Sequence, residues 1–98
     1  MKILPAPTAF DWDKGNTDKN LHKHNVLNRE TEEIFSDESL KIFEDVKHSY
    51  KEQRFVAYGV SSLNRKLIVV FTVRKQNIRI ISARDQNKKE RAIYEKSI

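Results

Sequence analysis

From residue 48 onward, this sequence holds the residue types that metal-free cleavage of a phosphodiester needs. His48 and Glu52 stand four residues apart. Six arginines follow them, of which Arg54, Arg74, Arg79 and Arg84 lie in predicted strands. Cleavage of RNA by this chemistry requires a base for the 2′-hydroxyl proton, an acid for the leaving 5′-oxygen and cations for the charged transition state. These residues are therefore candidates for such a site.

The histidine and the glutamate are the candidates for proton transfer. Histidine side chains titrate near neutral pH, so one of the two groups could act as the acid and the other as the base or as an orienting partner. A histidine and a glutamate at this spacing also commonly form a hydrogen bond on the protein surface. Both interpretations stay open at this point.

The arginines can be sorted by strand alternation, because residues two apart on a strand share a face. This rule places Arg84 on the face of Ile80 and turns Arg79 to the opposite face. Arg54, Arg74 and Arg84 would each stand at the end of a strand. Their planar guanidinium groups could converge there on one phosphate. The alternative is a solvated rim in which each arginine pairs with a carboxylate.

The sequence lacks the residues and motifs that several other classes of catalytic or binding site require. The sequence has no cysteine, and so no disulfide, thiolate nucleophile or thiolate metal ligand. It has no Gly-x-Ser-x-Gly, Walker or dinucleotide-binding motif, and its two glycines, Gly15 and Gly59, cannot build a phosphate-cradling loop. His22 and His24 would project about 200° apart on a helix, so they do not form a metal site there. We predict no cofactor and no metal.

The positive charge is concentrated in the last third of the chain. Residues 1–64 hold 9 Lys and Arg against 11 Asp and Glu, a balance of −2, whereas residues 65–98 hold 10 against 3, a balance of +7. Such a field attracts RNA, because neutralising phosphates releases counterions, and it also attracts acidic proteins. The charge indicates a polyanionic or acidic partner without deciding between them.

The length of 98 residues suffices for one core and not for two. We expect a flexible N-terminal arm over residues 1–9, where Pro5 and Pro7 stand close together, and one domain over residues 10–98. The longest apolar run, Leu67 to Val73, is too short to cross a bilayer, and the first nine residues lack a signal-peptide pattern. We therefore expect a cytoplasmic protein without membrane contact.

Runs rich in β-branched residues predict an antiparallel meander of strands. These runs cover Arg54–Ser61, Lys66–Arg74 and Ile78–Arg84 and are joined by short connections. Shorter strands are predicted at Phe10–Trp12 and Ser39–Phe43. A polar loop that carries His48 separates the last of these from the meander.

Helix signals flank the strands. Asp13 stands where it would cap a helix over residues 14–24, Asn28 one over residues 29–36, and Asp85 one near residues 88–95. Trp12 is expected to anchor the core, and Ile34 and Phe35 are expected to face inward. The prediction is an α+β fold with N-terminal helices, an antiparallel β-meander sheet and a C-terminal helix.

A further pattern joins these pieces in a fixed order. In the first half its pieces are Phe10-Asp11-Trp12-Asp13, Lys19-Asn20, Lys23-His24, Phe35-x-Asp37, His48-Ser49, Glu52-x-Arg54-Phe55 and Gly59-x-Ser61. In the second half they are Arg65 to Arg74, Ile78-Arg79-Ile80-Ile81-Ser82-Ala83-Arg84, Lys89-Glu90-Arg91 and Tyr94-Glu95. The joint pattern, from Phe10 to Glu95, resembles the BrnT toxin family.

The resemblance implies a RelE-like α+β fold and an endoribonuclease that blocks translation. It also implies a BrnA-type antitoxin partner in a toxin–antitoxin hetero-oligomer, which would contact DNA only through the antitoxin. Two positions depart from the family pattern: Asn25 stands where glycine is usual, and Gln53 where a second acid is usual. Asparagine tolerates a left-handed backbone, so the turn at Asn25 is compatible. Because Gln53 replaces that acid, a weakened or inactive toxin is an alternative to an active one.

Three hypotheses about function follow. In the first, the chain is a metal-independent endoribonuclease, with a catalytic set of His48, Glu52, Arg54 and Arg84 and an RNA-phosphate-binding set of Arg74, Arg79, Arg91 and Tyr94. Tyr94 is the aromatic residue expected to be partly exposed, so that a base could stack on it. In the second, the basic surface is a non-enzymatic module that only docks an antitoxin or a nucleic acid. In the third, the chain is a structural or ribosome-associated basic protein.

Overall fold

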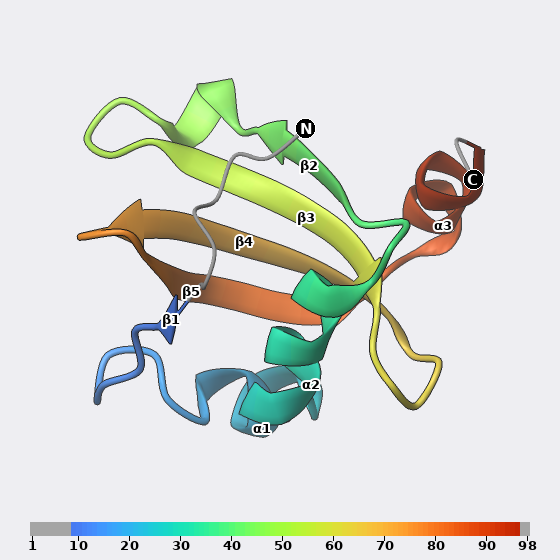
Figure 1. The fold of residues 1–98 in the computed structure, drawn as a ribbon, viewed down its shortest axis with the longest axis horizontal. Coiled ribbons are helices and arrows are strands. Elements are labelled where there is room, and N and C mark those ends of the chain that lie inside the picture. Colours follow the sequence, from blue (N-terminus) through green and yellow to red (C-terminus); the bar gives the residue numbers. More distant parts are fainter. Residues whose placement is uncertain (1–8, 97–98) are drawn as a thin grey trace.

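The computed structural model describes residues 9–96, which form one sheet with helices beside it (Figure 1). The strands are β1 (Ala9–Phe10), β2 (Lys41–Glu44), β3 (Arg54–Val60), β4 (Lys66–Arg74) and β5 (Asn77–Asp85). The helices are α1 (Lys19–His24), α2 (Asn28–Glu33) and α3 (Lys88–Lys96), with the short 3-10 helices η1 (Ile34–Ser36) and η2 (Val46–His48). The arm predicted over residues 1–9 lies outside the described residues, apart from Ala9, which begins β1.

The sheet has the strand order β1-β5-β4-β3-β2. From β2 to β5 each strand pairs antiparallel with its neighbour in the chain, so the predicted meander is confirmed. The first strand, β1, pairs parallel with β5 through Ala9–Asn77 and Phe10–Ile78. The sheet is therefore mixed, whereas the sequence predicted a purely antiparallel one.

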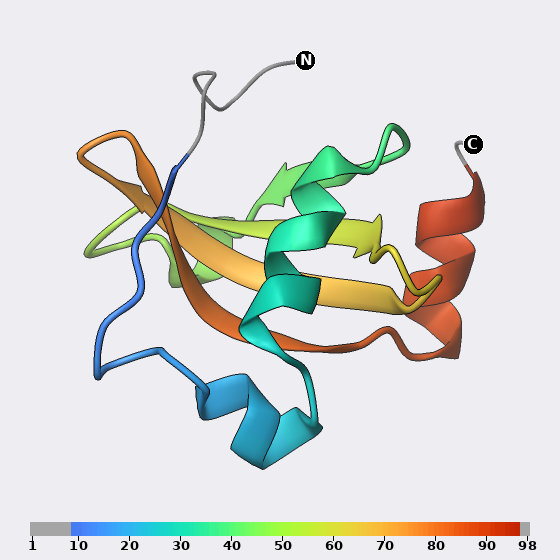
Figure 2. The same cartoon turned by 60° about the horizontal axis from the view of Figure 1, so that its bottom comes forward.

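Helix α1 lies beside the outer edge of β5, α2 and η1 cross one face of the sheet, and α3 lies at its end (Figure 2). The covered face supplies the core, because Phe55, Ala57 and Gly59 of β3 are buried while the residues between them are half-exposed. From η1, Ile34 is fully buried against this face. No helix in the described part of the chain is long and apolar enough to span a membrane.

A row of aromatic rings ties the elements together. Phe35 of η1 contacts Phe10 of β1 and Phe71 of β4 edge-on, with ring centroids 5.6 and 5.2 Å apart, and Phe71 stacks on Phe55 of β3 at 5.4 Å. Trp12 packs against the same core, and its indole N–H donates to a Glu32 carboxylate oxygen at 2.6 Å. The predicted inward positions of Trp12 and Phe35 are confirmed.

The first predicted helix is shorter than the sequence suggests, because Asp13 does not cap it. The Asp13 carboxylate accepts the Gly15 amide N–H at 2.8 Å and a guanidinium N–H of Arg79 at 2.9 Å. Residues 14–18 form turns, and α1 begins only at Lys19. The side chain of Asp13 is therefore bound to the turn and the sheet and is not available to a helix start.

The other two predicted caps are also wrong. Asn28 lies inside α2, because Leu27 precedes the helix and its amide N–H donates to the Glu30 carboxylate at 3.1 Å. At α3 the cap is Asn87, whose side chain accepts the Glu90 amide N–H at 2.9 Å while Glu90 accepts the Asn87 amide N–H at 2.8 Å. Asp85 instead binds Arg65, a partner that only the folded chain brings near.

The turn at Asn25 forms as predicted. Asn25 ends α1 with a left-handed backbone (φ 57°, ψ 37°), and its amide N–H donates to the Leu21 carbonyl at 3.1 Å. Glycine adopts this conformation without strain and asparagine tolerates it. The departure from the family pattern at this position is therefore accommodated by the fold.

A β-bulge in β5 changes which residues share a face. Ser82 pairs with Val70, but Ile80 pairs with Phe71, so Ile81 is one extra residue in the strand. Before and after the bulge the alternation runs in opposite phase. Arg79 therefore lies on the same face as Arg84, and the prediction that Arg84 shares a face with Ile80 is wrong. Strand alternation could not reveal this, because it assumes an unbroken ladder.

Gly59 allows η1 to approach β3 closely, and this leads to a prediction about stability. A Cβ atom at Gly59 would lie 2.8 Å from the Cβ of Ile34 and 3.2 Å from its carbonyl oxygen. We expect Gly59→Ala to lower the free energy of unfolding by about 1–3 kcal/mol, because η1 must move away from the sheet. Chemical denaturation measures this change. Ser62→Ala, in the exposed loop after β3, is the control, and equal stability of all three proteins would show that η1 shifts without cost.

Candidate functional site

A hollow of about 170 Å³ lies at the end of the sheet where β3 begins and β4 ends. For comparison, one water molecule occupies roughly 30 Å³, so the hollow has room for a small charged group rather than for a drug-sized ligand. The residues that line it are Gly15, Asn16, Lys19, Glu52, Arg54, Arg74, Arg79, Ile80 and Ile81. Cations outnumber the single carboxylate among these lining side chains, which makes the hollow suitable for an anion.

Two arginines meet in the hollow because β3 and β4 are antiparallel. Arg54 at the start of β3 pairs with Thr72, two residues before Arg74 at the end of β4. Glu52 lies between them: one carboxylate oxygen is 3.1 Å from Nη2 of Arg74, and the other is 3.9 Å from Nη2 of Arg54. The Thr72 hydroxyl donates to the carbonyl of Gln53 at 2.7 Å, which ties the segment that carries Glu52 to β4.

The bulge brings Arg79 to the same hollow, where it is held by the loop before α1. Its guanidinium donates to both carboxylate oxygens of Asp13 at 2.9 and 3.0 Å and lies 3.5 Å from Asp11. These hydrogen bonds lower the pKa of Asp13 and raise the pKa of Arg79. A Cβ atom at Gly15 would lie 2.9 Å from Nη2 of Arg79, so glycine leaves the space that this pair occupies.

Lys19 also lines the hollow, and the sequence analysis did not include it among the candidate site residues. It is the first residue of α1, and its position follows from Asn20, whose side-chain oxygen accepts the Ala83 amide N–H of β5 at 3.0 Å. Among residues 9–96, no carboxylate lies within ion-pair distance of its ammonium group. The only sequence signal for Lys19 was its place in the Lys19-Asn20 piece of the family pattern.

Arg84 does not reach the hollow. It pairs across the sheet with Ile68, four residues along β4 from Thr72, which corresponds to about 13 Å. Both carboxylate oxygens of Glu90 accept its guanidinium N–H groups, at 2.8 and 2.9 Å. The prediction that Arg84 converges with Arg54 is wrong, because the end of β5 lies beside the start of β4 and not beside its end.

The two predicted RNA-binding residues of α3 also lie away from the hollow. The Tyr94 side chain is only 4% exposed, so the expectation of partial exposure is wrong. Its hydroxyl donates to the Asp37 carboxylate at 2.6 Å, and burial together with this contact raises its pKa to about 12. Tyr94 therefore packs α3 onto the fold. Arg91 is exposed and donates to the Gln86 carbonyl at 2.9 Å.

His48 and Glu52 are not paired with each other. His48 belongs to η2, is exposed, and its Nδ1 lies 2.9 Å from the Asp45 carboxylate. Glu52 faces Arg54 and Arg74 instead. Within residues 9–96, no three or more histidine, aspartate or glutamate side chains gather closely enough to hold a metal ion.

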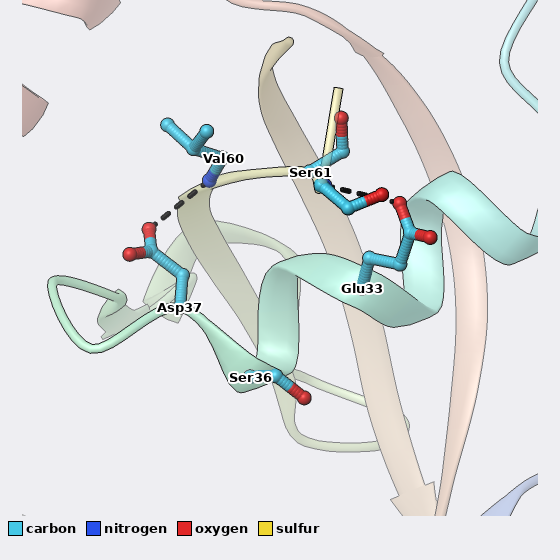
Figure 3. A pocket seen from close by; sticks show the side chains of 6 residues that line it. Glu33, Ser36, Asp37, Val60 and Ser61 are labelled. Carbon is cyan, nitrogen blue, oxygen red and sulfur yellow. Dashed lines mark hydrogen bonds between the residues drawn. The ribbon is translucent and has the colours of Figure 1, made fainter. Parts of the chain in front are cut away.

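A second pocket, of about 280 Å³, lies where η1 meets the end of β3 (Figure 3). Its lining carries the carboxylates of Glu33 and Asp37. Asp37 accepts the Val60 amide N–H at 3.0 Å as well as the Tyr94 hydroxyl, and Glu33 accepts the Ser62 amide N–H at 3.1 Å. These acids stabilise the fold, and their charge is unsuited to a phosphate.

The fold and the first hollow define a small α+β protein with a cationic hollow at one end of its sheet. Residues 12–90 match the family model described as ribonuclease toxin, BrnT, of type II toxin-antitoxin system. The match spans most of the chain, and the protein belongs to this family. A search of curated proteins finds no match. Membership in a type II toxin family implies that an antitoxin is a partner of this chain.

Proposed function

We propose that this protein is a metal-independent endoribonuclease that cleaves RNA at the hollow and thereby inhibits translation. The observation that supports this most is the position of the Glu52 carboxylate between the guanidinium groups of Arg54 and Arg74. It combines a proton acceptor with two phosphate-binding cations at one place. Membership in a family of ribonuclease toxins supports the same activity.

The Glu52 carboxylate marks the place where the scissile phosphate would bind. A phosphodiester carries two unesterified oxygens, and arginine binds such oxygens as it binds a carboxylate. The phosphate would displace Glu52 from Arg54 and Arg74, and Lys19 would add a third cation at the rim. Arg79 would contribute the positive charge of its guanidinium group from a fixed position, because Asp13 already accepts two of its N–H groups.

The displaced carboxylate would then act as the base. Glu52 takes the proton of the 2′-hydroxyl, the 2′-oxygen attacks phosphorus, and the bond from phosphorus to the 5′-oxygen breaks. The products are a 2′,3′-cyclic phosphate and a 5′-hydroxyl, and the leaving oxygen needs one proton. His48 is the proposed acid, and this role requires the loop from η2 to β3 to carry its ring from Asp45 toward the hollow.

We also propose the fold, the antitoxin type and the place of action that the family resemblance implies. We propose that the fold is RelE-like, with α2 and η1 on one sheet face and catalytic cations on the other. A BrnA-type antitoxin would neutralise the toxin in a hetero-oligomer and would supply the only contact with DNA. The toxin would act in the cytoplasm, where translation takes place. Gln53 does not alter the proposed base, because Glu52 occupies the hollow.

A non-enzymatic binding module is the second candidate function. It is favoured by the carboxylate partners of the predicted arginines: Glu52 contacts Arg54 and Arg74, Asp13 contacts Arg79, and Glu90 contacts Arg84. Such pairs also occur on surfaces without catalytic activity. An activity assay separates the two candidates.

The test is an RNA cleavage assay with the purified full-length chain, in EDTA without ribosomes and in a magnesium buffer with ribosomes. We expect cleavage that leaves 2′,3′-cyclic phosphate ends, which mass spectrometry identifies. A 2′-fluoro oligonucleotide of the same sequence should stay intact, because it lacks the attacking hydroxyl. Intact RNA under both conditions would contradict nuclease activity and support the binding module.

A further inference from the structure

The sheet face opposite α2 and η1 changes in chemistry along the strands. The row of neighbours next to the hollow is Arg54, Thr72 and Arg79. The next row is mostly apolar and consists of Phe43, Val56, Val70 and Ser82. The third row is Lys41, Tyr58, Ile68 and Arg84. Successive rows are two residues apart, about 7 Å, so the apolar row lies between two rows that carry cations.

Phe43 is the unusual residue of this face. It lies on β2 at the edge of the sheet, and 48% of its surface is exposed. Its ring stands edge-on to the ring of Tyr58, with centroids 5.7 Å apart and an interplanar angle of 88°. This contact holds the ring in place and leaves a large part of it accessible. A small domain usually buries such a ring, because burial of apolar area is its main source of stability.

Tyr58 adds a polar group beside the exposed ring. It is half-buried, and desolvation raises the pKa of its hydroxyl, so the group remains a hydrogen-bond donor at neutral pH. Within residues 9–96 the Tyr58 hydroxyl forms no hydrogen bond. At the end of the sheet α3 contacts this face, through Glu90 on Arg84 and through the Ile93 and Tyr94 carbonyls on Lys41.

We propose that Phe43 and Tyr58 form a base-binding platform for single-stranded RNA. The identity of the polyanion rests on the proposed ribonuclease function. The charge of the face supports RNA as the occupant, because cations stand on both sides of the apolar row and the platform continues directly from the hollow. Aromatic rings stack on unpaired bases, whereas the bases of a duplex are stacked on one another. The substrate class is therefore single-stranded RNA, with a base close to the scissile phosphate resting on Phe43.

The test measures binding separately from cleavage. A fluorescent 2′-fluoro oligonucleotide and an abasic sugar–phosphate oligomer of the same length are titrated with the full-length protein at one salt concentration. We expect Phe43→Ala to weaken binding of the base-containing oligonucleotide about 5- to 150-fold, the range expected for one stacked base. Binding of the abasic oligomer should change less than twofold. Phe43→Trp should restore affinity, because it restores the aromatic face.

Leu63→Ala is the matched control, because Leu63 is also apolar and 71% exposed but lies in the loop between β3 and β4. Its affinity for both oligomers should equal that of the wild type. The platform proposal would be overturned if Phe43→Ala weakened binding of both oligomers equally, or weakened binding of neither. Circular dichroism shows whether each variant is folded, and Phe43→Leu keeps the strand apolar if the alanine variant unfolds. A wild type that binds the oligonucleotide but cleaves no RNA would contradict the ribonuclease proposal alone.

Discussion

Arg54→Ala should lower the rate of RNA cleavage about 10²- to 10³-fold, the effect expected when one donor to a developing negative charge is lost. Arg54 stands at the start of β3, and its guanidinium reaches the carboxylate that marks the proposed phosphate position. Arg74 faces the other carboxylate oxygen of Glu52 and Arg79 is bound to Asp13, so neither arginine is placed to take over the contact of Arg54. Single-turnover cleavage of a labelled RNA measures the change.

Arg29→Ala is the control for Arg54→Ala, because it removes the same charge from the exposed surface of α2 on the other side of the sheet. It should cleave RNA at the wild-type rate. Arg54→Lys should recover only part of the activity, since an ammonium group cannot hold two phosphate oxygens at once. Equal rates for Arg54→Ala and Arg29→Ala would show that net charge matters and that the hollow is not the catalytic site.

The second large effect is expected from Glu52→Gln. Cleavage should fall about 10²- to 10⁴-fold, because glutamine cannot accept the 2′-hydroxyl proton. Binding of a non-cleavable 2′-fluoro RNA should become tighter, because the phosphate no longer competes with a carboxylate for Arg54 and Arg74. Opposite changes in rate and affinity are the signature of a base that also occupies the phosphate position.

Rate and affinity are measured on the same protein preparation, with Glu38→Gln as the control. Glu38 is exposed in the loop before β2. Its replacement therefore removes an equal charge from a residue that does not line the hollow. If Glu52→Gln weakened binding as well as cleavage, Glu52 would be a structural partner of the arginines and not the base. A wild-type cleavage rate and a wild-type RNA affinity would show that Glu52 is not part of the catalytic site.

These two variants also separate the functional candidates. If the protein is a binding module, Arg54→Ala should weaken RNA or antitoxin binding. No variant should then change a cleavage rate, because the wild type does not cleave RNA. The ribonuclease predicts a loss of rate in both variants and opposite shifts in affinity. The Gln53 position adds no ambiguity to this comparison, since Gln53 contributes its backbone carbonyl to Thr72 and its side chain is exposed.

Local patterns in the sequence determined the elements of the sheet. β-Branched alternation located β3, β4 and β5 to within one or two residues, because one buried face imposes a period of two on a strand. The same patterns missed the helix starts, since Asp13 and Asp85 have the side chains of helix caps but bind Arg79 and Arg65 in the folded chain. A capping propensity is a local preference, and a partner distant in sequence can override it.

The candidate site was only partly predictable for the same reason. Residue type and order made Arg54 and Arg74 candidates for binding one phosphate and Glu52 a candidate for proton transfer, and the antiparallel meander brings the three together by placing the start of one strand beside the end of the next. The sequence also contained the family pattern that residues 12–90 match. It did not place Arg79, since one inserted residue, Ile81, reverses the alternation of β5 and turns Arg79 toward the hollow.

The sequence by itself determined the α+β class, the meander, the family and the residue types of the chemistry. The tertiary structure alone decided that Lys19 joins the hollow, that Arg84 is held by Glu90 at the other end of the sheet, and that the Tyr94 ring is buried. The physical reason is that periodicity and composition act over a few neighbouring residues. Ion pairs, bulges and helix docking depend on contacts between residues tens of positions apart, which exist only once the chain has folded.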